Sequence, residues 1–360
     1  MEYGYSLVKH IKITNSDPIC AIDLNQELLL FGTMLGFCGF YLINEKKLKV
    51  VSETEDEHIL ATQIKKDKLC FAVGDEKIII VEKKDNNYNS VKEINNYYDD
   101  AEHYKKCNDI FCMLKEDLLF SIELRIPGEE ERAVDMRICD WKISNYEKNK
   151  SFEGSIKLSN YWVPFDFDGK LLVYIDFYEK MKKSLKIYNF RHKSFTLSQK
   201  LEELNEEEHL GHISHVKILK NDNIFLVHSF VFCQIRDFKF KLIKEYEHKG
   251  KEIIACDVYY KEEKENKNNK ENKDKKENKD NKDNKSELTI VLLDINCGVY
   301  LYHEKNNYEE YLFNLHKLYS IDSVIKEQKF FSLGYPYYIK IYKKLFAITT
   351  DQGCFLLEKQ

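Results

Sequence analysis

Three histidines spaced three residues apart directly follow a run of glutamates, and they are the first candidates for chemistry in this sequence. They are His209, His212 and His215, and the glutamates occupy 206–208. A zinc site needs three or four side chains that converge on one point. His215 begins a run typical of a strand, and this spacing on an extended chain does not bring all three rings together. The pattern therefore predicts no metal site.

A second candidate is the pair of aspartates in the segment FDFDGK. Asp166 and Asp168 stand two residues apart and are followed by Gly169. Paired carboxylates suit calcium, but the full ligand pattern of an EF-hand loop is absent from the sequence. A turn between two strands, closed by the glycine, explains the segment better.

Signatures of catalysis are missing from the sequence. It contains no glycine-rich phosphate loop, no GxSxG nucleophile elbow and no HExxH motif. We therefore expect no catalytic residue, no cofactor and no metal. The chain is predicted not to be an enzyme.

The elements that would position any site are short apolar runs, and the uncharged segment 28–43 shows how they are built. It reads LLLFGTMLGFCGFYLI. A membrane helix needs about 20 mostly apolar residues, which is longer than this run. The segment divides into two short strand-like halves, rich in apolar and aromatic residues, around a glycine-containing turn. We expect two strands here and no transmembrane segment.

Composition narrows the class of protein. The chain has 360 residues, 43% of them hydrophobic, and a net charge of −5. This charge excludes a globally basic nucleic-acid binder, and we expect no nucleic-acid partner. The ten cysteines form no CxxC pair, and most lie in apolar runs, which indicates buried, reduced thiols. With no signal peptide at its start, the chain is expected to be cytoplasmic.

Units of four strand-like runs recur along almost the whole chain. One register places them at 19–52, 58–94, 110–158, 162–201, 214–247, 253–315 and 336–359. The seventh unit lacks its fourth strand, while a spare strand stands at 5–13, ahead of the first unit. If the spare strand completes the last unit, the ring closes without an unpaired edge. The sequence therefore predicts an all-β fold, a single seven-bladed β-propeller over 1–360 whose N-terminal strand closes the last blade.

Two segments do not fit this register. The segment 261–287 is rich in Lys, Asn and Glu and has no apolar side chains. It is predicted to be a disordered loop inserted within the sixth blade. The segment 317–335 precedes the last blade and is predicted to be an irregular loop or a short helix.

The four-strand unit resembles the WD40-repeat family. In that family the third strand typically ends in Trp-Asp, and a Gly-His pair precedes the first strand. Here Gly211-His212 is the one Gly-His pair, and only Asp140 and Asp237 keep the acid at the end of a third strand. The repeats are thus degenerate, and the fifth unit is the most typical. The resemblance implies a platform for protein partners, within a multi-protein complex and without activity of its own.

Loop charges separate according to the class of connection. Connections from an outer strand to the next inner strand, and from a second to a third strand, share one face of a propeller. On that face fall the acidic candidates for partner binding: Glu55, Asp56, Asp99, Asp100, Glu129, Glu130, Glu206 and Glu207. We call this face the acidic face. On the opposite, basic face fall Lys46, Lys47, Lys65, Lys66, Lys68, Lys83, Lys84, Arg191, Lys193, Lys343 and Lys344.

These patterns favour a non-enzymatic scaffold or adaptor that binds a basic peptide or protein on the acidic face. One alternative is a membrane-trafficking or coat-type propeller that docks anionic lipid through the basic face. The segment Phe190-Arg191-His192-Lys193 keeps one Arg of the double-arginine motif of phosphoinositide-binding propellers. A second alternative is an enzyme on the same scaffold, which would need inward-facing carboxylates with perturbed pKa values around the central channel.

Overall fold

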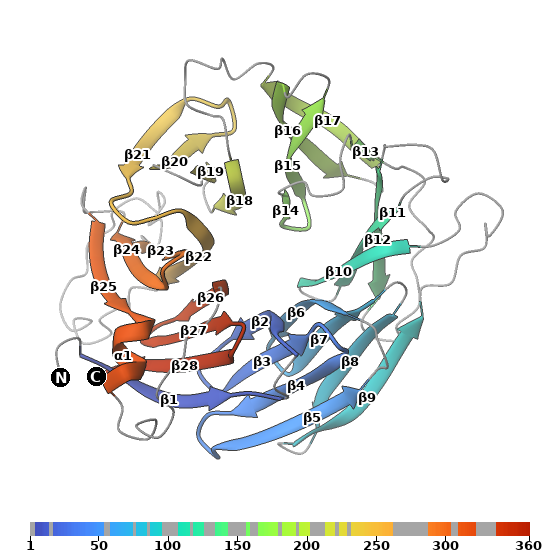
Figure 1. Cartoon of the computed structure of the whole chain (residues 1–360). Helices are drawn as coiled ribbons and strands as arrows, with labels where there is room; N and C mark the ends of the chain where they lie inside the picture. The colour runs from blue at the N-terminus through green and yellow to red at the C-terminus, as the bar shows by residue number, and fades with distance from the viewer. Residues whose placement is uncertain are drawn as a thin grey trace, which may run out of the picture.

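The structure is a computed structural model of the whole chain. It describes residues 4–13, 17–53, 58–74, 77–84, 87–95, 107–115, 118–125, 134–142, 156–158, 165–178, 182–191, 194–201, 213–219, 223–228, 232–261, 287–303, 309–321 and 336–360. Seven four-stranded antiparallel sheets, or blades, surround a common axis (Figure 1). We name the strands of each blade inner, second, third and outer, counting from the axis.

The first three blades follow the chain directly. Blade one holds β2 (Ile19–Leu24), β3 (Leu28–Thr33), β4 (Phe37–Leu42) and β5 (Lys47–Glu53). Blade two holds β6 (Ile59–Lys65), β7 (Lys68–Val73), β8 (Lys77–Lys84) and β9 (Asn87–Asn95). Blade three holds β10 (Cys107–Lys115), β11 (Leu118–Arg125), β12 (Val134–Lys142) and β13 (Ile156–Leu158).

The next three blades repeat the same order. Blade four holds β14 (Phe165–Phe167), β15 (Leu171–Tyr178), β16 (Lys182–Arg191) and β17 (Ser194–Leu201). Blade five holds β18 (Ile213–Leu219), β19 (Asn223–His228), β20 (Phe232–Asp237) and β21 (Leu242–Glu247). Blade six holds β22 (Ile253–Lys261), β23 (Glu287–Asp294), β24 (Gly298–His303) and β25 (Glu309–Asn314).

Blade seven joins the two ends of the chain, as predicted. It holds β26 (Pro336–Tyr342), β27 (Leu345–Thr350), β28 (Gly353–Lys359) and, as its outer strand, β1 (Tyr5–Ile11). The antiparallel register of β1 on β28 runs from Tyr5 opposite Lys359 to Ile11 opposite Cys354. The pairing covers the exposed edge of β28, so the seven-bladed fold and its closure by the N-terminal strand are both confirmed.

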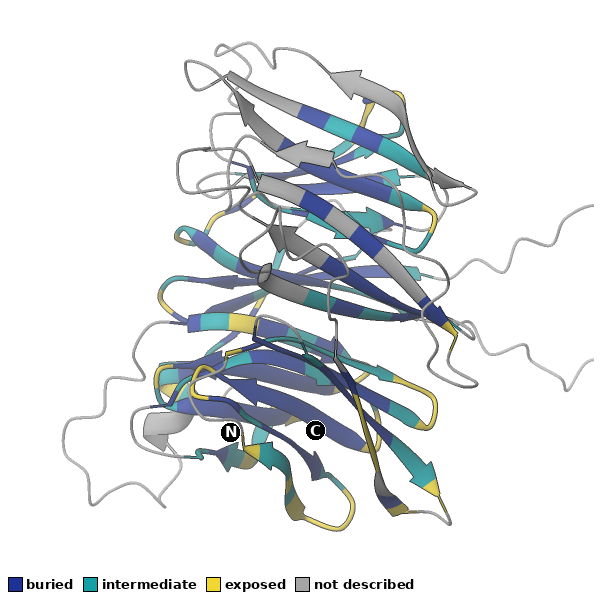
Figure 2. Ribbon diagram, turned by 90° about the vertical axis from the view of Figure 1, so that its right-hand side faces the viewer, coloured by how far each residue is buried: buried dark blue, intermediate teal, exposed yellow. Residues whose placement is uncertain are grey.

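Each blade is apolar on both sides because it is packed between two neighbours. In β3, Leu28 and Leu30 pack towards blade two, while Leu29 and Phe31 pack towards blade seven. Comparable apolar clusters fill all seven interfaces between consecutive blades. Buried residues accordingly follow the strands, and exposed residues gather at the turns (Figure 2). This two-sided burial explains the uncharged run at 28–43.

That run is a hairpin, as expected. Strands β3 and β4 pair from Leu28 opposite Leu42 to Gly32 opposite Cys38. Gly36, with φ of 93°, makes the turn. Gly32 has a different role, because a Cβ atom there would lie 2.1 Å from Cγ2 of Ile59 in blade two. Along the described parts of the chain, no helix is long and apolar enough to cross a membrane.

The two irregular segments are only partly described. The predicted insertion 261–287 joins β22 to β23, and Lys261 opposite Glu287 is the last pair of that ladder. Both ends of the predicted range therefore belong to strands, and 262–286 lies outside the described residues. The segment before blade seven begins with the short helix α1 (Leu315–Ile321), and 322–335 again lies outside the described residues.

Candidate functional site: two faces and the centre of the ring

The eight acidic candidates lie outside the described residues, but the strands that flank them are described. The segments that contain them are 54–57 between β5 and β6, 96–106 between β9 and β10, 126–133 between β11 and β12, and 202–212 between β17 and β18. The strand order makes three of these connections outer-to-inner and one second-to-third. The positions of the eight side chains stay a prediction.

The basic face is better described, over blades seven, one and two. Its turns join inner to second strands and third to outer strands. Seven of its lysines are exposed: Lys46, Lys47, Lys65, Lys66, Lys84, Lys343 and Lys344. We call them the turn lysines. The side chain of Arg191, like the whole of Lys193, lies outside the described residues, so the double-arginine comparison is untested.

Three of the turn lysines occupy a backbone conformation that L-residues seldom adopt. Lys46, Lys66 and Lys343 have φ of 54°, 50° and 54°. The left-handed region costs a residue with a Cβ atom about 1 kcal/mol, and glycine or asparagine occupies it more easily. Gly36, Gly169 and Gly353 have positive φ in other turns of the ring, as do Phe240 and Cys297. Lysine is therefore not the residue that these three turns favour.

Two glutamates on this side of blades one and two form ion pairs with lysines other than the turn lysines. Glu82 pairs with Lys68, and Glu27 pairs with Lys83 at 3.3 Å. None of the turn lysines forms an ion pair with another described residue; Lys343 donates to Oε1 of Gln26 at 2.8 Å.

A hollow of about 100 Å³ lies between blades one and two. Its lining carries both signs of charge, including Glu27, Glu45 and Lys49.

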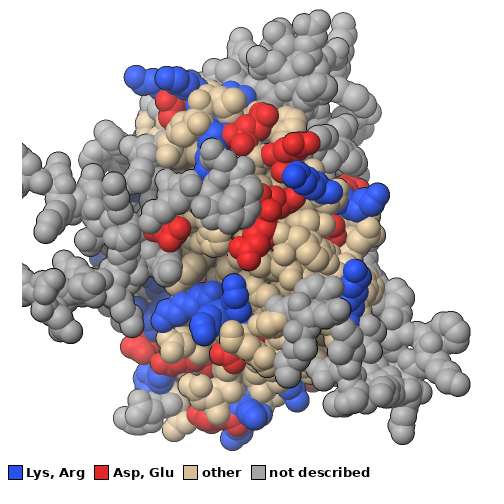
Figure 3. Space-filling view, turned by 90° about the vertical axis from the view of Figure 1, so that its left-hand side faces the viewer, with Lys and Arg blue, Asp and Glu red and all other residues tan. Residues whose placement is uncertain are grey.

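On the outer wall of the ring, unlike on its two predicted faces, acidic and basic residues are not separated. On the side formed by blades five to seven, acidic and basic side chains alternate (Figure 3). The concentration of lysine on one face is thus not a property of the whole surface.

Polar side chains at the centre of the ring link each blade to the next. The inner strands leave one edge without a partner strand, so their N–H groups face the axis. Asp23 of blade one accepts a hydrogen bond from the N–H of Ile64 in blade two at 2.7 Å. Asp166 of blade four accepts from Ile218 in blade five, also at 2.7 Å. The contact recurs between further pairs of blades.

Two more contacts follow this geometry. Gln63 of blade two accepts from the N–H of Leu114 in blade three. Asp257 of blade six accepts from Ile341 in blade seven at 3.0 Å. In each case the acceptor is an inner-strand side chain, and the donor is an inner-strand N–H of the following blade. The polar residues thus satisfy the edge of the next blade.

Lys340 adds charge to this arrangement where the ring closes. Its ammonium group lies 3.4 Å from Oδ1 of Asp257 and 4.0 Å from Oδ1 of Asp23, and so links blades six, seven and one. The carboxylate of Asp257 is the main reason why the pKa of Lys340 lies above its ordinary value. Burial raises the pKa of Asp23, although Lys340 and the N–H of Ile64 oppose this rise.

The inward carboxylates that the enzyme alternative requires are therefore present. However, Asp23, Asp166 and Asp257 are each held by a backbone N–H, and Lys340 partly neutralises two of them. These hydrogen bonds and ion pairs connect neighbouring blades and so support the ring.

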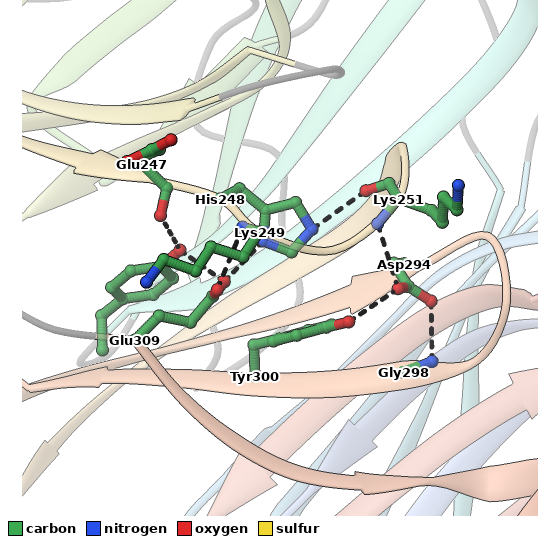
Figure 4. A network of polar contacts seen from close by, with 9 residues as sticks. Glu247, His248, Lys249, Lys251, Asp294, Gly298, Tyr300 and Glu309 are labelled. Carbon is green, nitrogen blue, oxygen red and sulfur yellow. Dashed lines mark hydrogen bonds and ion pairs between the residues drawn. The ribbon is translucent and has the colours of Figure 1, made fainter.

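A second polar network lies where the chain enters blade six (Figure 4). His248, fully buried in its side chain, places Nε2 2.9 Å from the carbonyl oxygen of Lys251 and Nδ1 2.6 Å from Oε1 of Glu309. Tyr302 donates to the same Oε1 at 2.6 Å. Burial alone would raise the pKa of Glu309, but the bonds from His248, Tyr302 and the N–H of Lys249 hold it below its ordinary value.

The same network includes a carboxylate that fixes a turn. Asp294, 2% exposed, accepts from the N–H of Gly298 at 2.7 Å and from the hydroxyl of Tyr300 at 3.1 Å. It also accepts from the N–H of Lys251 at 3.3 Å. The network thus ties the β21–β22 connection to blade six.

The metal candidates separate in the structure. Asp168 accepts from the N–H groups of Lys170 and Leu171 at 2.7 and 2.8 Å, which makes the expected turn, while Asp166 points to blade five. His215 lies on β18 with Nδ1 2.9 Å from Oγ of Ser214, and His209 and His212 lie outside the described residues. Within the described part of the chain, no cluster of three His, Cys, Asp or Glu side chains could hold a metal.

The cysteines behave as the sequence indicated. Eight of them are described as free thiols, and all of these except the half-buried Cys20 are buried. Burial raises the pKa of Cys38 and Cys297 to about 12, which keeps both thiols protonated. Cys20 donates to the carbonyl oxygen of Ile59 in the neighbouring blade at 3.0 Å. Protonated, buried thiols such as Cys38 and Cys297 are weak nucleophiles.

Sequence reasoning missed the ring-centre contacts and the His248 network. The signal for the former was a polar residue at the same place in several inner strands: Asp23, Gln63, Asp166 and Asp257. The network at blade six had no recognisable sequence motif. The one Gly-His pair of the sequence, Gly211-His212, precedes blade five instead.

Comparisons with known proteins agree with the architecture. No family model and no curated protein matches the sequence. Among solved structures, the WD40 β-propeller domain of Doa1 matches with a TM-score of 0.61 and 8% identity, over 99% of this chain and 97% of that one. The computationally designed Ika8 protein matches with a TM-score of 0.54 and 8% identity, over 98% and 99%. The chain is therefore a seven-bladed β-propeller whose fold is similar to that of the WD40 domain of Doa1.

Proposed function

We propose that this propeller is a non-enzymatic interaction scaffold that binds a basic segment of a partner protein on its acidic face. The observation that carries the proposal is the sorting of charge by connection class. All eight acidic candidates fall in connections of the two classes that share one side of a propeller. A surface of one sign attracts a partner of the other sign and orients it during encounter.

The same side also offers apolar contacts. The β3–β4 turn is a second-to-third connection and exposes Met34 by 40% and Leu35 by 43%. The turn is held in place, because the N–H of Leu35 donates to Asp17 at 2.8 Å and that of Met34 donates to the carbonyl of Pro18 at 3.1 Å. An apolar turn held in this way, on the same side as the acidic connections, suits a segment that combines basic and apolar residues.

We also propose a cellular environment and a class of partner for this scaffold. A scaffold of this kind acts within a multi-protein complex, and buried protonated thiols are in keeping with a reducing, cytoplasmic environment. The negative net charge of −5 gives no reason to expect a nucleic-acid partner.

A charge-reversal experiment tests the proposal. Glu55→Lys, Glu129→Lys and Glu206→Lys together should weaken binding of a fluorescent Lys/Arg-rich peptide by about tenfold or more, since each exposed pair contributes up to about 1 kcal/mol. The matched control reverses three acids of the basic side, Glu45, Asp67 and Glu358, with the same change in net charge.

The outcome is read from fluorescence anisotropy together with thermal melting. A selective loss in the first variant, at an unchanged melting temperature, supports the proposal. Equal losses in both variants would show that only net charge matters and would refute the site.

A further inference from the structure

We infer that the basic face of blades seven, one and two is a docking surface for an anionic lipid bilayer. This inference is independent of the proposed function, because it concerns the opposite side of the ring. It begins with the seven turn lysines, which are exposed and form no ion pair with another described residue.

The turn lysines belong to three consecutive blades. Blade one packs on blade seven through one apolar cluster and on blade two through another. The lysines lie at the β4–β5, β6–β7, β8–β9 and β26–β27 connections, which all emerge on the same side of their sheets. Turn tips of adjacent blades at one end of a propeller can meet a flat surface together.

Acids offset this charge only in part. On the same side, Glu27 and Glu82 are engaged with Lys83 and Lys68. This leaves Glu45, Asp67 and Glu358 against the seven turn lysines, together with Asp85 of the β8–β9 connection, which lies outside the described residues. An excess of positive charge remains over the three blades.

The identity of the turn residues adds a second observation. Lys46, Lys66 and Lys343 stand at left-handed positions where glycine or asparagine fits the backbone better. One such lysine occurs in each of the three blades. A long cationic side chain at a strained turn tip is expected where the charge itself is used.

A surface that has many lysines but no exposed apolar side chains described at its turn tips suits an anionic bilayer better than a protein partner. Tight protein interfaces centre on buried aromatic or apolar residues. Apart from the Met34–Leu35 turn of the opposite side, the exposed large apolar side chains described in these blades lie on strands and not at the turn tips: Leu48 and Val50 on β5, Val91 on β9 and Tyr338 on β26. An anionic headgroup layer needs only cations, and each lysine near such a surface strengthens binding by about fivefold.

The test uses the full chain and vesicles of phosphatidylcholine with 0, 15 or 30 mol% phosphatidylserine. We expect flotation that rises with phosphatidylserine and falls with added salt. Lys46→Asn, Lys66→Asn and Lys343→Asn together should lower the partition coefficient by about 100-fold. Asparagine tolerates the left-handed backbone, so this variant should melt at or above the wild-type temperature.

A matched control removes three exposed lysines elsewhere. Lys9→Asn, Lys249→Asn and Lys251→Asn make the same change in net charge on β1 and on the β21–β22 connection. This control should bind vesicles within about threefold of wild type. Equal losses in both triple variants, or wild-type flotation that ignores phosphatidylserine, would overturn the inference. Saturable binding of an oligoglutamate peptide without vesicle binding would overturn it in favour of an acidic protein.

Discussion

Acid should destabilise this propeller through His215, an imidazole on the inner strand of blade five. Burial, reinforced by the nearby charge of Lys217, lowers the pKa of His215 to about 4 from an ordinary value of 6.5. A hydrogen bond with the backbone of Ile254 in blade six opposes this shift only in part. The folded chain therefore keeps the ring neutral at a pH where the unfolded chain protonates it.

The sign and size of the effect follow from this difference. Because the pKa is depressed in the folded state, the stabilising contribution is fully present above pH 6.5 and is lost as the pH falls towards 4. The linkage relation gives a loss of about 2 kcal/mol at pH 5 and about 3 kcal/mol by pH 4. This is a large part of the free energy of unfolding of a typical domain.

The assay is urea unfolding at pH 8 and pH 5 for the wild type and for His215→Gln. The variant cannot be protonated at this position, so its free energy of unfolding should fall by about 2 kcal/mol less than that of the wild type over this range. His10 and His316 also have lowered pKa values, but they titrate in both proteins and cancel in the difference. An equal fall in both proteins would refute the reasoning.

Three further predictions concern how the ring is held together. Removal of 1–13 should lower the melting temperature by more than about 10 °C, because it exposes the edge of β28. A synthetic peptide containing β1 should restore the melting temperature. An unchanged melting temperature after the removal would contradict the closure. Lys340→Met should lower the free energy of unfolding in urea by about 2 kcal/mol, because it leaves two carboxylates without their cation. Adding Asp257→Asn to this variant should recover part of the loss. If the effects of the two substitutions simply add, Lys340 and Asp257 are not coupled. Gly32→Ala should cost about 2 kcal/mol because its Cβ would overlap Ile59, and a cost under about 0.5 kcal/mol would show that the two blades can separate there.

The fold was largely predictable because propeller strands carry a strong local signal. Burial between two neighbours makes second strands such as β3 and β27 uncharged runs, and the turns between strands are polar. The spare strand at 5–13 and the incomplete last blade then fixed the closure. Boundaries were less accurate: strand pairing at Lys261 and Glu287 extends into the predicted insertion, because backbone pairing does not require apolar side chains.

The ring-centre contacts were harder to predict because they depend on two blades at once. Asp23 or Gln63 in an apolar run does not show which N–H it will meet, since the donor lies in the next blade. The separate roles of two glycines were hard to predict for the same reason. Gly36 makes the turn, as expected, whereas Gly32 is required by a neighbour in blade two that the local sequence does not show.

The position of a bound basic peptide tests the proposed function most directly. A Lys/Arg-rich peptide with a photoreactive group should be cross-linked to the full chain, and the products mapped by mass spectrometry. We predict cross-links within 54–57, 96–106, 126–133 or 202–212, and to the Met34–Leu35 turn. Cross-links confined to the basic face, at 43–47, 65–68 or 343–344, would contradict an acidic docking face.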